Sequence, residues 1–413
     1  MGTTCIFSLE MSIPGATMPT AGVSMVSVKP THRRRGILTA IMRRQLQDVA
    51  DRGEAVAALW ASESAIYGRF GYGLASQAMN LSVERQRATL AHDITSSGCV
   101  RFVDEAEALE KWPACLDRWR VTRPGAITRS AGRWEFGLER SRKKPGSERR
   151  FLAQYEEDGM VRGYVRYEWG GVFNSWLPNA KLKVNELVAE TPQAYAALWK
   201  LVLNTDLVGT IEAPLRPADE PLYHMLADSR HLQRSLMDAL WIRLLDIPKA
   251  LSARRYAADG AVTLTVHDDF RPEQGGKYRL EVRDGEGHCQ RTTGPGDLEL
   301  HVRDLGAVYL GSTSLTELAQ AGRVCGAPET VTRADRLFAW PVPAWCQEVF
   351  AEVLGAEYRV GSAGGMSYGR LSSAGTSRAA SFRRGPARHR GCCRRVTQPP
   401  SRAWNSRSSS RWP

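Results

Sequence analysis

The sequence predicts two α/β units followed by an α+β unit. The order strand, turn, helix, strand, short helix occurs twice, first over residues 22–73 and again over residues 182–227. From about Asp259 the pattern changes to short alternating strands separated by turn residues such as Asp284-Gly285, which is typical of an α+β domain. For the second unit, a generic α/β order unrelated to the first unit remains an alternative.

The first unit is organised around residues 26–39, which read Val-Ser-Val-Lys-Pro-Thr-His-Arg-Arg-Arg-Gly-Ile-Leu-Thr. Residues 22–28 alternate toward apolar and predict a strand. Pro30 cannot donate a hydrogen bond to a sheet, so we expect the strand to end there and to diverge from its neighbour. Apolar residues of the following segment fall on one helical face until Gly53, which predicts a helix.

The turn between this strand and helix predicts an anion site. It contains Arg33, Arg34, Arg35 and Gly36. The start of a helix offers free backbone N–H groups and a positive dipole end, and a glycine lets an anion approach the backbone closely. From these residues alone, a solvated basic helix start remains an alternative. His32 stands beside the turn, but a histidine there more often packs or faces water, and we assign it no role.

The next segment carries a family resemblance. An apolar run at residues 55–60 precedes residues 61–73, which read Ala-Ser-Glu-Ser-Ala-Ile-Tyr-Gly-Arg-Phe-Gly-Tyr-Gly. This order resembles the GNAT acetyltransferases, whose signature Gln/Arg-x-x-Gly-x-Gly/Ala is met by residues 33–38, although Leu38 departs from its last position. The three arginines and the Tyr-Gly-Arg-Phe-Gly-Tyr-Gly run are similar to one branch, the Eis (enhanced intracellular survival) N-acetyltransferases.

The resemblance implies transfer of an acetyl group from acetyl-CoA, the cosubstrate, to a primary amine. Aminoglycosides and lysine side chains are the family's acceptor classes. The expected cosubstrate-binding residues are Val26, Ser27, Val28, Arg33, Arg34, Arg35, Gly36, Ile37, Leu38, Thr39, Ser62 and Glu63. Backbone groups of the strand can pair with the pantetheine amide as an added strand would. Ser62 also fits the N-cap of the short helix, and both roles can hold at once.

Tyr67 is the candidate general acid. A phenol with a pKa near 10 stays protonated at neutral pH and can donate a proton to the leaving thiolate. A packed aromatic residue is the alternative, and we interpret Tyr72 as structural. In Eis-like enzymes the chain's own terminal carboxylate acts as the base, but here the matching Phe350 is internal. The actual carboxylate belongs to Pro413, at the end of a long tail that gives it little positioning.

The second unit lacks an Arg-Arg-x-Gly turn, so we expect it not to bind CoA. The segment from residues 335–338 to residues 345–350 resembles the end of a sterol carrier protein domain, the third domain of Eis-like proteins. The predicted fold is therefore two tandem GNAT-like domains followed by a sterol-carrier-protein-like α+β domain. The predicted boundaries are 1–88 for a partial acetyltransferase domain, 89–256 for a degenerate GNAT-like domain, 257–350 for the third domain and 351–413 for a tail.

Both ends depart from the family pattern. The family's first strand and following helices would precede Thr3, and without them we expect an exposed apolar sheet surface and an acceptor pocket lacking one wall. Residues 351–413 are rich in Ser, Gly and Arg without apolar periodicity, which predicts disorder and resembles out-of-frame or read-through sequence. Twelve arginines against two glutamates give this tail +10 of the total +12, so the rest of the chain is nearly neutral.

Composition limits the classes of protein to which the chain can belong. No run of 18 apolar residues and no basic leader is present, so we expect no membrane span and no signal peptide. The eight cysteines are scattered without a Cys-x-x-Cys pair, which predicts no metal site and fits a reducing cytoplasm. The resemblance implies a homo-oligomer, a hexamer in the family.

Two other functions stay open as alternatives. One is a non-catalytic GNAT-like binding protein whose third domain holds a lipid or a partner. The intact arginine turn together with Tyr67 disfavours it. The other is a nucleic-acid binder acting through the arginine tail. That tail lacks interleaved aromatic residues beyond Trp404 and Trp412, so we expect no specific nucleic-acid partner.

Overall fold

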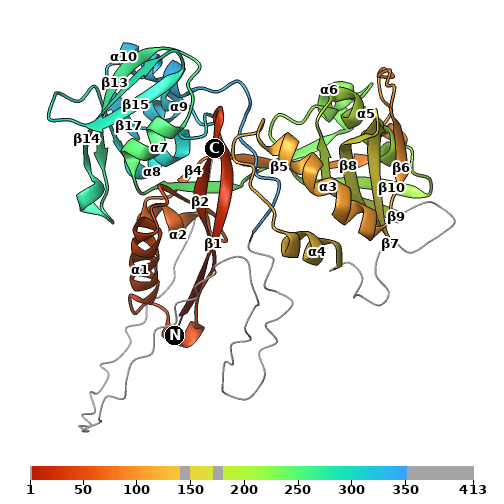
Figure 1. The fold of residues 1–413 in the computed structure, drawn as a ribbon, viewed down its shortest axis with the longest axis horizontal. Coiled ribbons are helices and arrows are strands. Elements are labelled where there is room, and N and C mark those ends of the chain that lie inside the picture. Colours follow the sequence, from red (N-terminus) through yellow and green to blue (C-terminus); the bar gives the residue numbers. More distant parts are fainter. Residues whose placement is uncertain (1, 140–148, 171–179, 351–413) are drawn as a thin grey trace, which may run out of the picture. The chain divides into compact units, whose positions relative to one another are not determined.

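The computed structural model describes residues 2–139, 149–170 and 180–350 (Figure 1). In this part of the chain the strands form three sheets. The predictions of a disordered tail at 351–413 and of a terminal carboxylate at Pro413 lie outside the described residues. The predicted boundaries between domains stay predictions.

The first sheet belongs to the predicted acetyltransferase domain. Its strand order is β1 (Gly2–Ile13), β2 (Ala16–Val28), β3 (Val56–Trp60), β12 (Leu240–Leu244) and β4 (Gly73–Leu74). Helix α1 (Ile37–Asp51) joins β2 to β3 and lies beside β1 and β2 (Figure 1). Its buried residues Met42, Leu46 and Val49 share one apolar cluster with the sheet. The predicted helix is therefore confirmed, ending two residues before Gly53.

The second sheet has seven strands. In order these are β11 (Gln233–Asp238), β5 (Gln77–Glu84), β10 (Val208–Pro217), β9 (Ala180–Ala189), β8 (Met160–Gly170), β7 (Arg149–Glu157) and β6 (Cys99–Phe102). Along β8, Tyr164 packs in one apolar cluster and its neighbour Val165 in another. Alternate residues of a strand point to opposite faces. Helix α5 (Pro192–Leu203) therefore covers one face, and α3 (Glu105–Arg120) and α4 (Ala131–Glu139) cover the other.

Short helices complete the two α/β units. In the first unit, α2 (Ser64–Tyr67) follows β3 and carries the candidate acid. In the second unit, α6 (Leu222–Met225) follows β10. In each unit a parallel strand pair flanks the helix, β2 with β3 and β9 with β10. The predicted repetition of strand, turn, helix, strand and short helix is confirmed.

The two sheets exchange strands. Residues 73–84 do not form one continuous strand, because β4 pairs in the first sheet and β5 in the second. The break falls at Ala75 and Ser76, whose amides both donate to the Leu240 carbonyl at 2.9 and 3.2 Å. Conversely, β12 leaves the second unit and enters the first sheet between β3 and β4. The two segments, residues 75–76 and the start of β12, meet here because each satisfies backbone hydrogen-bonding groups of the other.

The outer edge of β1 is covered at Glu10–Ser12 by a segment distant in sequence. Residues 125–128 run antiparallel beside it: the Gly125 amide donates to the Ser12 carbonyl at 2.7 Å, and the Thr128 amide donates to the Glu10 carbonyl at 2.9 Å. The large apolar side chains that stand most exposed in the described ranges lie between residues 94 and 236. A segment distant in sequence therefore supplies the cover that the sequence could not reveal.

The third unit is an α+β domain, as predicted. Its sheet has the order β15 (Glu286–Arg291), β14 (Gly276–Arg283), β13 (Gly260–His267), β16 (Leu298–His301) and β17 (Val324–Gly326). Its helices are α7 (Ile247–Ala253), α8 (Val302–Val308), α9 (Leu315–Gln320) and α10 (Pro328–Phe338). Ser314 caps α9, since its side chain accepts a hydrogen bond from the Glu317 amide at 2.9 Å.

Helix α8 packs on the first sheet with almost no space between the two backbones. A side chain on Gly73 of β4 would overlap the Arg303 carbonyl and approach the Ala307 amide. On the other side of the contact, a side chain on Gly306 would overlap the Ile242 carbonyl of β12. Glycines at both positions therefore let the third domain dock on the strands that follow the Tyr67 segment.

We expect Gly73→Ala to lower the free energy of unfolding by at least about 2 kcal/mol, because the new methyl group meets rigid backbone. Gly68→Ala is the matched control: Gly68 has an ordinary φ of −56°, and a Cβ there meets nothing within 4 Å. Urea denaturation of both variants checks this. Equal stability of the two would show that the contact between α8 and β4 is looser than described.

Candidate functional site

The turn between β2 and α1 has the backbone of an anion site. Gly36 takes the N-cap position with φ 74°, and no side chain caps the helix. A Cβ at Gly36 would meet nothing within 4 Å, so the space in front of the helix start is open. Arg34 is also left-handed, with φ 59°. Left-handed residues in a turn direct successive amides toward a common concavity that suits anions.

Free donors and positive charge meet at this turn. The first helical hydrogen bond runs from the Ala40 amide to the Gly36 carbonyl at 3.0 Å, so the three amides of residues 37–39 precede it. The side chains of the arginines at 33–35 are exposed, and none forms an ion pair within the described residues. These groups fit a pyrophosphate, which needs several donors and compensating charge.

Within the described residues, strand β2 presents an unpaired edge beside the turn. It pairs with β3 only over Thr20–Gly22, whereas β1 remains paired to its other edge as far as Val28. The expected divergence of the strand from its neighbour therefore occurs, but it begins well before Pro30. Met25, with φ 53°, lies where the register of β1 and β2 shifts. The sequence does not predict this bulge, because methionine rarely adopts a positive φ.

Tyr67 ends α2 with its ring in the apolar core of the first domain. It is 6% exposed and shares a cluster with Met42 and Leu59. Val26 and Leu38, two of the predicted cosubstrate residues, pack partly buried against this same cluster. The structure thus brings the strand, the turn and the candidate acid to one apolar cluster.

The environment keeps Tyr67 protonated. Burial raises the pKa of its phenol above the ordinary value, a hydrogen bond with the Ser62 side chain acts to lower it, and the charge of Glu63 adds to the rise. Ser62 is not the N-cap of α2, which corrects that part of the prediction: Glu63 holds the cap position without a side-chain bond. Ser62 and Glu63 are both exposed, and their backbone immediately precedes α2.

Phe350 is the last described residue and is 1% exposed. Its carbonyl accepts a hydrogen bond from Arg133 Nη1 at 3.5 Å. The same guanidinium lies 6.0 Å from the ring of Phe7, which pairs with Gly22 at the point where β2 leaves β3. Phe350 therefore connects through one arginine to the strands that open toward the cosubstrate turn.

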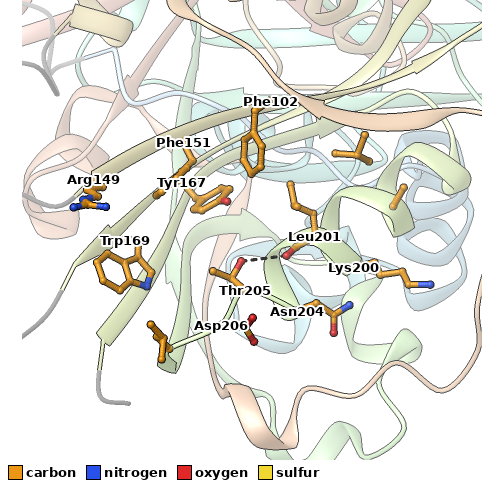
Figure 2. A pocket seen from close by; sticks show the side chains of 13 residues that line it. Phe102, Arg149, Phe151, Tyr167, Trp169, Lys200, Leu201, Asn204, Thr205 and Asp206 are labelled. Atoms are coloured by element: carbon orange, nitrogen blue, oxygen red, sulfur yellow. Dashed lines mark hydrogen bonds between the residues drawn. The ribbon is translucent and has the colours of Figure 1, made fainter. Parts of the chain in front are cut away.

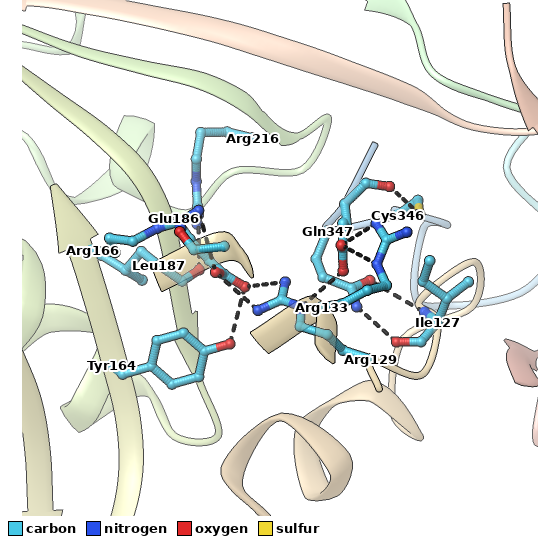
Figure 3. Close-up of polar contacts among 12 residues, drawn as sticks. Ile127, Arg129, Arg133, Tyr164, Arg166, Glu186, Leu187, Arg216, Cys346 and Gln347 are labelled. Carbon is cyan, nitrogen blue, oxygen red and sulfur yellow. Dashed lines mark hydrogen bonds and ion pairs between the residues drawn. The ribbon is translucent and has the colours of Figure 1, made fainter. Parts of the chain in front are cut away.

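A buried ionic network holds the segment before Phe350 (Figure 3). Arg129 Nε donates to Glu348 at 2.8 Å and Arg129 Nη2 to Glu186 of β9 at 2.8 Å, while Arg133 forms a second ion pair with Glu348. Gln347 donates to the Ile127 carbonyl at 2.8 Å. Burial acts to raise the pKa of Glu348, but both arginines outweigh it and hold that pKa below its usual value. Glu348 is therefore a weak base.

The corresponding turn of the second domain differs. The Thr191 side chain caps α5 and accepts a hydrogen bond from the Ala194 amide at 3.1 Å, so one of the helix-start donors is already used. No glycine or arginine stands at this helix start. These features support the prediction that the second domain does not bind CoA.

A separate hollow of about 720 Å³ lies on the second domain between its sheet and the end of α5 (Figure 2). Aromatic residues form one side of it, namely Phe102, Phe151, Tyr167 and Trp169. It shares no residue with the predicted cosubstrate site. Two charged residues on its rim are paired, as Lys200 contacts Asp93 at 2.7 Å and Asp206 contacts Arg85 at 3.1 Å.

The described ranges contain neither a metal-binding cluster nor a membrane-spanning helix. No group of three or more His, Cys, Asp or Glu side chains there is arranged to hold a metal ion. No helix in those ranges is long and apolar enough to cross a membrane.

The domains match known families in the predicted order. The acetyltransferase (GNAT) domain matches residues 1–75, a second acetyltransferase (GNAT) domain matches residues 125–244, and the sterol carrier protein domain matches residues 247–347. The fold and the site thus define an acetyl-CoA-dependent N-acetyltransferase with tandem GNAT domains and a sterol-carrier-protein-like third domain, which confirms the predicted fold class.

Relatives that align with most of the chain identify the branch of the acetyltransferases. A Streptomyces avermitilis protein described as an uncharacterized N-acetyltransferase is 38% identical over 356 residues, covering 85% of this chain and 87% of its own length. N-acetyltransferase Eis of Mycobacterium tuberculosis is 35% identical over 350 residues, covering 83% and 84%. The crystal structure of Eis1 from Mycobacterium abscessus aligns with a TM-score of 0.76 at 33% identity, covering 85% and 87%. The chain belongs to the Eis family of N-acetyltransferases, as predicted.

We expect Gly36→Gln to weaken acetyl-CoA binding about tenfold or more, because the side chain fills the open space before the α1 amides. Reversing the charge with Arg34→Glu and Arg35→Glu should have a similar effect by repelling the pyrophosphate. Gly53→Gln is the matched control, since Gly53 follows the other end of α1 with the same φ of 74° and equally open space. Calorimetric titration checks the affinities. Unchanged binding in the Gly36 and arginine variants would place the cosubstrate elsewhere.

Proposed function

We propose that this chain transfers acetyl from acetyl-CoA to an aminoglycoside or lysine amine by direct attack, with Tyr67 as general acid. The observation that supports this most is the buried phenol of Tyr67, which shares one apolar cluster with Val26 and Leu38. Acetyl transfer requires a bound thioester, a neutral amine and a proton for the departing sulfur. The chain offers residues that can bind the thioester, and it offers Tyr67 as the group that can supply the proton.

The residues proposed to hold acetyl-CoA act in two ways. The free edge of β2 at residues 26–28 offers backbone groups to the pantetheine amide, as an added strand would. The amides of residues 37–39 and the arginines at 33–35 offer donors and charge to the pyrophosphate. Ser62 and Glu63 border the same site. The Ser62 side chain also acts to lower the pKa of the Tyr67 phenol.

Tyr67 supplies the proton. When the amine attacks the carbonyl carbon, the bond to sulfur breaks and negative charge collects on the thiolate. A protonated phenol that faces the sulfur neutralises this charge by donating its proton, a contribution of about 10²- to 10⁴-fold in rate. Because burial raises the pKa of Tyr67, the acid form persists through the neutral range.

The proposed base is a carboxylate at Phe350, by the family resemblance. In the chain as it stands, Phe350 carries an amide carbonyl, which has almost no basicity. Arg133 contacts that carbonyl and would contact a carboxylate in the same place. The acceptor class, a hexameric assembly and a cytoplasmic location also rest on the resemblance and stay proposals.

Tyr67→Phe keeps the ring and removes only the proton. We expect kcat to fall by at least about tenfold while the affinity for acetyl-CoA changes little. In the parent enzyme, the rate should decline only above about pH 10, because the raised pKa delays loss of the proton; this decline should vanish in the variant. Thiol release measured across pH with an aminoglycoside acceptor checks both. Equal losses of binding and rate would instead indicate a packing role.

Ending the chain at Phe350 should increase turnover. It places a carboxylate, ordinarily of pKa about 3.5, where Arg133 now contacts the amide carbonyl. A chain ended two residues later, at Glu352, is the control, because it also loses the basic tail but puts its carboxylate elsewhere. Thiol release with a saturating amine compares the three proteins. If the chain ended at Phe350 is no faster than the other two, a terminal carboxylate does not act as the base.

A further inference from the structure

The turn that follows Tyr67 is held from behind by another domain. Residues 67–72 run from the end of α2 through a short 3-10 helix, Gly68–Phe70, to the start of β4. On the side away from solvent this turn meets two segments distant in sequence, Arg243 of β12 and the loop at residues 268–271. Neither segment belongs to the cosubstrate site described above.

Arg243 and Asp268 form a completely buried ion pair. Arg243 Nη2 donates to Asp268 Oδ2 at 2.5 Å, and both side chains are 0% exposed. Asp268 is itself fixed, because its Oδ1 accepts hydrogen bonds from the amides of Phe270 and Arg271 at 3.2 and 3.0 Å. The carboxylate therefore links a strand of the first sheet to a rigid loop of the third domain.

The guanidinium of Arg243 packs directly against the turn. A side chain on Gly71 would overlap this guanidinium and approach Val302 Cγ1 at 2.9 Å, and Gly71 has φ 81°. The next residue, Tyr72, is completely buried and lies edge-on to the Tyr67 ring, with centroids 6.1 Å apart and an interplanar angle of 76°. Packing therefore runs from Asp268 through Arg243 to the backbone at Gly71, and the adjacent Tyr72 ring contacts the Tyr67 ring.

The loop at residues 268–271 also contacts Phe70 and helix α1. Phe270 packs edge-on to Phe70 with centroids 5.0 Å apart, and the Arg43 guanidinium of α1 lies 5.5 Å from the Phe270 ring. Arg271 Nη1 donates to the Leu46 carbonyl of α1 at 3.4 Å. One third-domain loop therefore contacts both the Tyr67 turn and the cosubstrate helix.

We propose that Arg243 and Asp268 are positioning residues for Tyr67, through which the third domain holds the phenol in its donating orientation. This inference rests on the proposed role of Tyr67 as general acid. Burying two charges is costly, and such pairs often give little net stability compared with apolar packing. A pair that fixes the orientation of an acid would act on the rate, because small displacements of a catalytic group cost much of its effect. The third domain would then contribute to turnover without binding a ligand.

Asp268→Asn tests the proposal. It removes the charge that orients Arg243 and keeps the shape of the side chain. Glu220→Gln is the matched control, since Arg216 and Glu220 form a buried pair at 2.9 Å in the second domain. Each of the two pairs joins a buried guanidinium to a buried carboxyl group, so the variants and the parent are compared at one neutral pH. We expect Asp268→Asn to lower kcat about tenfold or more with less than about a twofold change in acetyl-CoA affinity, and Glu220→Gln to leave kcat unchanged.

A double-mutant cycle shows whether the effect passes through Tyr67. In the Tyr67→Phe background, Asp268→Asn should cause no further loss of kcat, because the variant has no phenolic hydroxyl whose orientation could affect the rate. If the two losses multiply, Asp268 acts independently of Tyr67 and the positioning role is overturned while the general acid stands. If Tyr67→Phe alone retains the parent rate, the general-acid role fails and this inference fails with it.

Phe270→Leu is the second variant and keeps the test decisive if Asp268→Asn yields too little folded protein. It removes the ring that packs on Phe70 without unpairing a buried charge. The same cycle with Tyr67→Phe applies. A loss of kcat confined to the background that contains Tyr67, with acetyl-CoA affinity retained, supports the proposal. A parallel loss of affinity and rate in both backgrounds overturns it.

Discussion

The exchange of strands between the first two sheets is the constraint on which the site depends. Strand β12 completes the first sheet between β3 and β4, although it lies more than 160 residues after β4 in the chain. Because β12 enters there, Arg243 reaches the back of the Tyr67 turn. The exchange also places β12 and β4 side by side as the platform on which α8 docks, through Gly73 and Gly306. The acetyltransferase domain is therefore built from parts of all three units.

Charge is used in two opposite ways around this site. At the turn before α1, the arginines at 33–35 are exposed and unpaired within the described residues, so their charge is available to an anionic ligand. Behind the site the arginines are buried and pair with carboxylates of the protein, as with Arg243 and Asp268 or with Arg129 and Glu348. Exposed cations attract a ligand but fix little, whereas buried pairs cost desolvation and fix geometry. The same residue type thus serves binding in one place and orientation in the other.

The segment at residues 344–350 is held in place by contacts with residues distant in the sequence. Its Trp345 amide donates to the Pro124 carbonyl at 2.8 Å, and Gln347 bonds to Ile127. Residues 125–128 in turn cover the edge of β1. The end of the third domain is therefore tied to the first sheet through a strip of the second. A carboxylate or carbonyl at Phe350 is held in place by these contacts rather than by local secondary structure.

The sequence by itself determined the local elements and the cosubstrate turn. Apolar periodicity located α1 and α5, and the arginine–glycine turn pointed to the helix start, because these signals arise from neighbours within a few residues. Only the tertiary structure decided that residues 74–85 split between two sheets, that Met25 forms a bulge, that Glu63 rather than Ser62 takes the N-cap position of α2, and that Asp268 lies behind the candidate acid. Each of these depends on partners distant in the chain. Strand pairing and burial are settled by which surfaces meet, and no local pattern of residue types encodes that choice.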